Sequence, residues 1–303
     1  MKSLTIFSAP KPFSDPHIAT IQRNAIRSWC QLGAEVEVIL VGDEQGIAET
    51  ALEFGVKHLP EVSCNDQGTP LVGSIFSLAR ENSSSPLLAY INADILILSD
   101  LLSMSQRMLS LADKFILVGQ RWDLEILTEM DFSENWESRF RQSILEHGKL
   151  HPPAGSDYFI YPRSCFQEIP DFAIGRAGWD NWMIYQARRN GWLAVDATRS
   201  ITIAHQQHDY AHLPQGKPHY KLPETDENIR LAGGREITRF SLLDVDHRLI
   251  AGKLYPGKLN WDTFRRKIET FPLLVFNNYQ LTKKITSLFH RLKHKFNQPK
   301  EGK

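Results

Sequence analysis

The stretch LLAYINADILIL, residues 87–98, places two apolar runs on either side of the polar segment Asn92-Ala93-Asp94. The run 87–91 is typical of a buried β-strand, so Asp94 is expected just beyond the carboxyl end of that strand. An Asx turn at the strand end would account for a carboxylate in this place. Alternatively, the side chains of Asn92 and Asp94 both bind one hard cation, Mg²⁺ or Mn²⁺, whose remaining ligands would be water and phosphate oxygens.

Strands and helices are expected to alternate on both sides of this stretch. Short apolar runs and segments with helical spacing take turns through the first 120 residues. This alternation favours right-handed βαβ units around a mostly parallel sheet with helices on both faces. We therefore expect a doubly wound α/β fold that binds ligands beyond the carboxyl ends of its strands. The expected strands are 4–8, 36–41, 56–59, one within 87–98, and 115–118, and the expected helices are 16–32, 47–54, 71–80 and 101–111.

The pattern changes after residue 120. A long loop is expected from His208 to Gly234, because this segment is polar and rich in His, Pro and Gly. The other expected elements are a helix around 134–147, a strand in 157–161, a helix over 179–189, and strands in 192–197 and 201–204.

The last part of the chain is basic. From Lys283 onward there are seven Lys or Arg and one Glu, and four apolar residues fall on one helical face: Ile285, Leu288, Phe289 and Leu292. The sequence thus predicts a main α/β domain over 1–250 and a basic, amphipathic helical extension over 251–303. Such a helix either makes peripheral contact with an anionic membrane or packs its apolar stripe onto the main domain.

The composition excludes several classes of protein. The 303 residues are 42% apolar and carry 35 basic and 35 acidic side chains, unlike disordered, collagen-like or coiled-coil chains. A formal charge of zero gives no reason to expect a nucleic-acid partner. Three cysteines without C-x-x-C spacing predict no disulfide framework or zinc ribbon and fit a cytoplasmic location. Neither a signal peptide nor a membrane-spanning run is expected.

The chain resembles the GT-A-fold glycosyltransferases, which use nucleotide-sugar donors. The resemblance rests on the first strand, 4–8, and its following loop, on the doubly wound first half, and on Tyr90-Ile91-Asn92-Ala93-Asp94 at the fourth strand. It extends over roughly residues 1–210. In that family an Asp-x-Asp signature holds the divalent metal that grips the donor diphosphate, and here Asn92 replaces the first Asp.

This resemblance implies a set of donor and metal contacts. Asp94 would bind Mn²⁺ or Mg²⁺, while Asn92 would contact the ribose or a metal-bound water. A histidine 20 to 30 residues beyond the catalytic carboxylate completes the metal site in the family, which points to His205, with His208 in reserve. The alternative for both histidines is a solvated loop. The residues expected to bind the nucleotide are Ser8, Ala9, Asn92, Ala93 and Asp94.

Two further acidic segments are candidates for catalysis. Asp180, in Gly178-Trp179-Asp180-Asn181, resembles the acceptor-side carboxylate that removes the proton from the attacking hydroxyl in inverting GT-A enzymes. Asp157, at the start of a strand, is the second catalytic candidate and a substrate-binding candidate. Trp179 is expected to stack against a sugar ring. The alternatives are that Asp180 merely favours a helix N-terminus and that Trp179 and Trp182 belong to a core helix.

The function expected from these residues is metal-assisted, inverting transfer of a hexosyl group from a nucleoside-diphosphate sugar to a hydroxyl acceptor. Two other functions stay open. One is a noncatalytic scaffold that binds a nucleotide or glycan, which the replacement at Asn92 favours. The other is a sugar nucleotidyltransferase, although the segment Ser8–Pro12 lacks the glycines of the phosphate-binding loop usual in that class.

Overall fold

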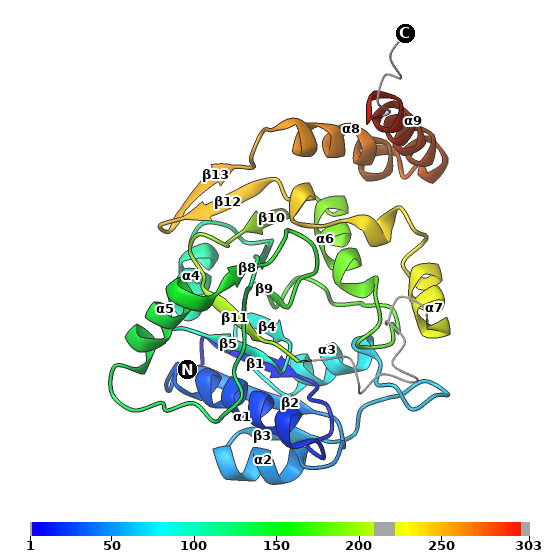
Figure 1. Cartoon of the computed structure of the whole chain (residues 1–303). Coiled ribbons are helices and arrows are strands. Elements are labelled where there is room, and N and C mark those ends of the chain that lie inside the picture. The colour runs from blue at the N-terminus through cyan, green and yellow to red at the C-terminus, as the bar shows by residue number, and fades with distance from the viewer. Residues whose placement is uncertain (1, 209–221, 298–303) are drawn as a thin grey trace.

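The computed structural model of the chain describes residues 2–208 and 222–297, with side chains as far as residue 291. Its centre is a nine-stranded sheet in the order β13-β12-β10-β6-β9-β4-β1-β2-β3 (Figure 1). Only two of its strands run antiparallel to their neighbours: β9, between β4 and β6, and β13, at one edge. The strands are β1 (Leu4–Ser8), β2 (Val36–Val41), β3 (Lys57–Leu59), β4 (Leu87–Ile91), β6 (Phe115–Val118), β9 (Tyr158–Pro162), β10 (Leu193–Asp196), β12 (His247–Ile250) and β13 (Lys253–Pro256).

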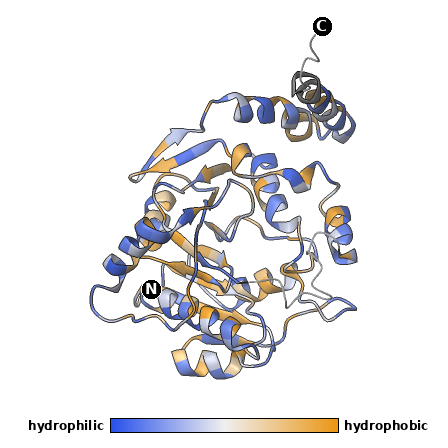
Figure 2. Cartoon of the chain, viewed as in Figure 1, coloured by the Kyte–Doolittle hydropathy of each residue, from blue (hydrophilic) through white to orange (hydrophobic). Residues whose placement is uncertain are grey.

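Helices cover both faces of this sheet. On one face α1 (Pro16–Cys30), α2 (Ile47–Phe54) and α4 (Asp100–Leu109) share a hydrophobic core with Leu4 and Ile6 of β1. On the other face α3 (Val72–Glu81) and α6 (Trp179–Arg189) share a second core with Phe7. Successive residues of β1 thus supply two separate cores, and Figure 2 shows the inner strands as hydrophobic. This is the doubly wound, mostly parallel α/β fold that the sequence predicts.

A second, four-stranded sheet stands beside the first, in the order β5-β11-β7-β8. Its strands are β5 (Ile95–Ile97), β7 (Trp122–Leu124), β8 (Lys149–Leu150) and β11 (Ile203–Gln206), and α5 (Trp136–His147) packs on it through Trp136, Phe140 and Ile144. The strand expected at 201–204 therefore begins and ends two residues later, and His205 lies inside it. The stretch 87–98 holds two strands, one in each sheet, and Asp94 lies between them.

The segment after β11 differs from the expected loop. Residues 223–231 form α7 (Pro223–Leu231), whereas 209–221 lie outside the described part of the chain. Proline at the first helical position and two acidic residues in the first turn, Glu224 and Asp226, favour this helix start.

The C-terminal part is helical, as expected. It consists of α8 (Trp261–Phe276) and α9 (Tyr279–Asn297), at the end of the molecule beyond β12 and β13 (Figure 1). The central sheet extends to Pro256, the last residue of β13. The domain boundary expected at residue 250 therefore falls inside the β12–β13 hairpin. Within the described residues, no helix is long and apolar enough to span a membrane.

Candidate metal centre and active site

Asp94, His205 and His208 form a cluster at the junction of the two sheets. The Nε2 atoms of His208 and His205 lie 3.1 and 3.7 Å from Asp94 Oδ2. One ligand atom of each residue lies within 4.8 Å of those of the other two. Strand pairing explains the approach: β11 runs antiparallel to β5 with His205 opposite Ile95, the residue after Asp94. The structure thus brings together both metal candidates, Asp94 and His205, with the reserve histidine.

The charge states of this cluster suit a metal ion. Burial opposes ionisation of Asp94, but the hydrogen bond with His208 and the nearby His205 and Lys11 hold the pKa of its carboxyl well below the usual range. Burial lowers the pKa of His205 despite the attraction of Asp94, which favours the neutral imidazole that metals bind. Asp94 Oδ1 is buried without a hydrogen-bond partner among the described residues. One carboxylate and two imidazoles therefore fit a divalent cation.

A carboxylate lies behind the ring of His205. His205 Nδ1 is 3.4 Å from Asp123 Oδ1, on the ring edge away from Asp94, and makes no hydrogen bond to any of the described residues. Asp123 in turn accepts a hydrogen bond from Arg121 Nε at 2.9 Å, and its Oδ2 lies 2.8 Å from His151 Nδ1. Carboxylates in this position commonly fix the tautomer of a metal-binding histidine. No local spacing links Asp123 to His205, because the two residues meet only through the pairing of β7 with β11.

Asp157 is held in place on both sides. Its Oδ1 accepts hydrogen bonds from Arg121 Nη1 at 2.6 Å and from Asn92 Nδ2 at 3.1 Å. The backbone N–H of Asn92 also donates to the carbonyl of Asp157 at 2.9 Å, continuing the β4–β9 pairing. Asn92 therefore uses its side-chain amide on Asp157, where the expectation was the ribose or a metal-bound water.

Asp180 lies in the first turn of α6, in a different environment. Its Oδ1 accepts a hydrogen bond from the backbone N–H of Gly178 at 3.3 Å, and no side chain among the described residues bonds to it. Burial raises the pKa of the Asp180 carboxyl, the nearby Asp157 adds to this, and backbone N–H groups oppose it. Gly178 has a φ of 112°, a left-handed conformation that permits this helix start. Asp180 is thus a desolvated carboxylate without a cationic partner.

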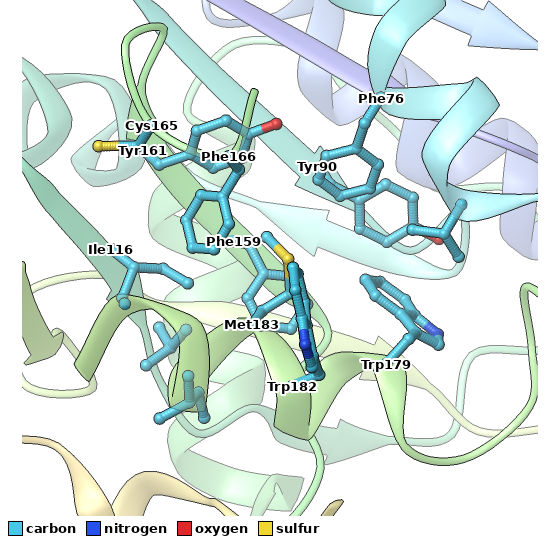
Figure 3. Close-up of a cluster of buried hydrophobic side chains, with 14 of the residues drawn as sticks. Phe76, Tyr90, Ile116, Phe159, Tyr161, Cys165, Phe166, Trp179, Trp182 and Met183 are labelled. Atoms are coloured by element: carbon cyan, nitrogen blue, oxygen red, sulfur yellow. The ribbon is translucent and has the colours of Figure 1, made fainter. Parts of the chain in front are cut away.

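Trp179 has the surroundings of a core residue. Its indole is 6% exposed and contacts the rings of Tyr90, Phe76 and Phe159 (Figure 3). Trp182 is likewise buried, against Phe172. Covered by these rings, Trp179 presents no free face for a sugar to stack on, which corrects the expected role. Sequence spacing alone does not distinguish a sugar-stacking tryptophan from a core tryptophan, because both would stand at the same position of the helix.

The loop after β1 contributes a cation that sequence reasoning did not single out. Ser8 is fully buried, and its Oγ has no hydrogen-bond partner among the described residues. It is therefore not accessible to a nucleotide, contrary to the expectation that it binds one. Ala9 is half-buried and Ala93 is 9% exposed. Lys11 is close enough to Asp94 for the two charges to interact, although burial lowers the pKa of the lysine. Its position in the loop three residues after the end of β1 was the available signal.

An open pocket of about 830 Å³ adjoins the cluster. The walls include His205 and His208 from the cluster, Arg121 and Asp123 from β7 and its approach, and His17 from the start of α1. Asp94 and Asp157 do not line the pocket themselves. Asp94 contacts the lining residue His208, and Asp157 pairs with the lining residue Arg121. The volume is that of a site for a small molecule of nucleotide-sugar size.

A comparison with known protein families finds no match, and neither does a comparison with curated protein sequences. Among solved structures, the chain is similar to a fragment of S. aureus TarS in complex with UDP-GlcNAc, with 14% identity and a TM-score of 0.47 over 81% of this chain and 68% of that one. Other TarS structures are matched over 56% and 39% of their length.

Two further similar structures come from other organisms. One is glucosyl-3-phosphoglycerate synthase from Mycobacterium tuberculosis in complex with Mn²⁺, UDP and phosphoglyceric acid, with 14% identity and a TM-score of 0.46 over 77% of this chain and 80% of that one. The other is the mannosyltransferase PcManGT from Pyrobaculum calidifontis in complex with GDP-Man and Mn²⁺, with 12% identity and a TM-score of 0.46 over 69% of this chain and 58% of that one. At such identity the likeness concerns the fold and leaves the activity to the chemistry of the site.

Proposed function

We propose that this protein transfers a sugar from a nucleoside-diphosphate donor to a hydroxyl acceptor, with a divalent cation at Asp94, His205 and His208. The observation that carries the proposal is the cluster itself. A buried carboxylate oxygen without a hydrogen-bond partner among the described residues and two histidines lie at a sheet junction, beside a pocket large enough for a nucleotide sugar. Imidazole nitrogens suit transition-metal ions better than Mg²⁺, which favours Mn²⁺ of the two expected ions.

The cations near this cluster support binding of a diphosphate. When bound, the metal supplies electrostatic stabilisation of the departing diphosphate. Lys11 lies close to Asp94, and Arg121 lines the pocket with a guanidinium already oriented by Asp123 and Asp157. These two side chains would neutralise part of the negative charge that grows on the leaving group.

Asp180 is the better candidate for the general base. The acceptor oxygen would form a bond to the anomeric carbon as the bond to the diphosphate oxygen breaks, and the hydroxyl proton would pass to Asp180. A single displacement of this kind inverts the anomeric configuration. The raised pKa of Asp180 and its lack of a cationic partner favour proton uptake. Asp157 is a weaker base candidate because Arg121 and Asn92 occupy its Oδ1, and we assign it a positioning role.

The test combines donor binding with turnover. A panel of UDP- and GDP-sugars is titrated calorimetrically in the presence of Mn²⁺, and release of UDP or GDP is then followed with water as the hydroxyl acceptor. We expect Asp180→Asn to bind the same donor as the native protein. Its rate of nucleotide release is expected to fall by at least about 10²-fold. The matched control is Asp113→Asn, an exposed carboxylate just before β6 and therefore at the amino edge of the sheet.

Three results would count against parts of this proposal. Donor binding without turnover in the native protein would favour the noncatalytic scaffold over the transferase. Equal nucleotide release by the native protein and Asp180→Asn would remove the base assignment. Absence of Mn²⁺-dependent binding for every donor in the panel would contradict the proposed function as a whole.

A further inference from the structure

An exposed apolar stripe runs the length of α8. Five large apolar side chains of this helix are solvent-exposed: Trp261 by 68%, Phe264 by 45%, Ile268 by 37%, Phe271 by 53% and Val275 by 51%. They follow one another at intervals of three and four residues, so they lie within about 80° of the helix circumference. We call this set the α8 stripe. A continuous apolar face of this length on the surface marks a contact with something other than water.

The opposite side of α8 anchors the helix to the catalytic domain. Arg266 is buried and donates to both carboxylate oxygens of Asp244, at 2.9 and 3.0 Å, and to Glu269 at 3.1 Å. Thr270 and Leu273 are also buried on this side. The orientation of α8 is therefore fixed, and the α8 stripe faces away from the body of the protein.

The expected apolar face of α9 is less exposed than the α8 stripe. Ile285 and Phe289 are half-buried, Leu288 is exposed, and the side chain of Leu292 lies outside the described residues. The docking that sequence analysis offered as an alternative thus covers part of α9, while the larger exposed apolar surface is on α8.

The charge of this end of the chain is opposite to that of the rest. Residues 251–303 hold 12 of the 35 basic and 3 of the 35 acidic side chains, a formal charge of +9, which leaves −9 on residues 1–250. Arg265 and Lys267 flank the α8 stripe on its two sides by helical spacing; Lys267 is exposed, whereas Arg265 is half-buried and pairs with Glu269 at 3.5 Å. Helix α9 adds the exposed Lys283, Lys284 and Arg291. Two copies joined through this surface would bring like charges together, which argues against self-association.

We propose that the α8 stripe and the cations around it form a docking surface for an anionic lipid bilayer. An apolar helix face with aromatic residues and flanking Lys and Arg suits the boundary between headgroups and acyl chains. The basic residues of α9 would add attraction to anionic headgroups. The negative charge of residues 1–250 would be repelled by the same surface and would turn the catalytic domain away from it. No helix has to cross the bilayer for this contact.

The test uses the full chain and two kinds of vesicle, of phosphatidylcholine alone and of phosphatidylcholine mixed two to one with phosphatidylglycerol. We expect co-sedimentation with the anionic vesicles only, weakened by added salt. Trp261→Ser combined with Phe271→Ser is expected to abolish it. Lys283→Gln combined with Lys284→Gln is expected to lower the partition coefficient by about fivefold for each charge.

The matched control is Leu52→Ser combined with Lys114→Gln. Leu52 is 85% exposed and Lys114 is exposed, and both lie far from α8 in the sequence. This variant is expected to bind the vesicles as the native protein does, and circular dichroism would establish that all variants are folded. Failure of the native protein to sediment with anionic vesicles would overturn the proposal. So would sedimentation that the Trp261 and Phe271 changes leave intact. A dimer in solution that these same changes dissociate would show that a second copy covers the stripe instead.

Discussion

The change Asp123→Asn tests whether this carboxylate supports the proposed metal centre as its place behind His205 indicates. Asp123 Oδ1 lies 3.4 Å from His205 Nδ1 and is itself held by Arg121 and His151. The negative charge at this point favours the tautomer with the proton on Nδ1, which leaves the Nε2 lone pair toward Asp94. An amide has nearly the same shape but no charge, so the ring of His205 loses its orientation while the pocket keeps its volume.

The expected effect is a 10- to 100-fold loss of Mn²⁺ affinity, the usual range for such a partner of a metal ligand. This corresponds to about 1.4–2.7 kcal/mol of binding free energy. The loss should stay below that of His205→Gln, which removes a ligand atom outright. The assay is calorimetric titration with Mn²⁺ alone, so that no assumption about donor or acceptor enters.

The control for this change is Asp131→Asn. Asp131 is an exposed carboxylate that also accepts hydrogen bonds, from Ser133 and Arg139, but neither partner belongs to the cluster. Its Mn²⁺ affinity is expected to equal that of the native protein. Native affinity in Asp123→Asn, with His205→Gln impaired, would refute the orienting role of Asp123. Native affinity in both variants would refute the metal centre itself.

Other positions give further predictions. Lys11→Met removes a positive charge near Asp94, so the affinity for Mn²⁺ should rise while the affinity for the anionic UDP should fall by about tenfold. Calorimetric titration with each ligand by itself measures the two opposite changes. Arg266→Met leaves the Asp244 and Glu269 carboxyls buried without their guanidinium and should cost about 3–5 kcal/mol in the free energy of unfolding, measured in urea. Burial opposes ionisation of Glu224, yet hydrogen bonds from Thr69, Asn65 and Arg176 hold its pKa below 4.5. Because the folded pKa is the lower one, its contribution to stability is present above pH 4.5 and is lost as the pH falls through the folded value. The stability difference between the native protein and Glu224→Gln should therefore shrink below pH 4.5 in urea denaturation.

The central sheet was predictable because its inner strands are buried on both faces. β1, β2, β4 and β6 read as short continuous apolar runs, and the helices between them show 3.6-residue spacing. Asp94 stood out for a related reason, since a carboxylate between two apolar runs has no role in packing. The antiparallel insertion of β9 between β4 and β6 has no such local signal, because its direction is set by pairing and not by composition.

The partners within the site were less predictable because they act across long sequence distances. The ion pair of Arg121 with Asp157 joins residues 36 apart, and the contact of His208 with Asp94 joins residues 114 apart. β7 and β8 have three and two residues, too few for any periodicity. α7 escaped notice because its sequence, PETDENIRL, is almost wholly polar. Its proline and early acidic residues were the only available markers.

The second sheet explains why a carboxylate and two histidines meet at this point. β4 ends at Ile91 and β5 begins at Ile95, so the polar residues between them interrupt neither hydrogen-bonded ladder. β11 pairs with both β5 and β7, which places His205 between Asp94 on one side and Asp123 on the other. Pairing of the same strand thus positions both the proposed ligand His205 and the carboxylate behind it. A change that weakens β11 pairing, at Ala204 for example, should therefore lower Mn²⁺ affinity although it alters no proposed ligand. A change at Arg266 that lowers the free energy of unfolding by the same amount should leave Mn²⁺ affinity unchanged.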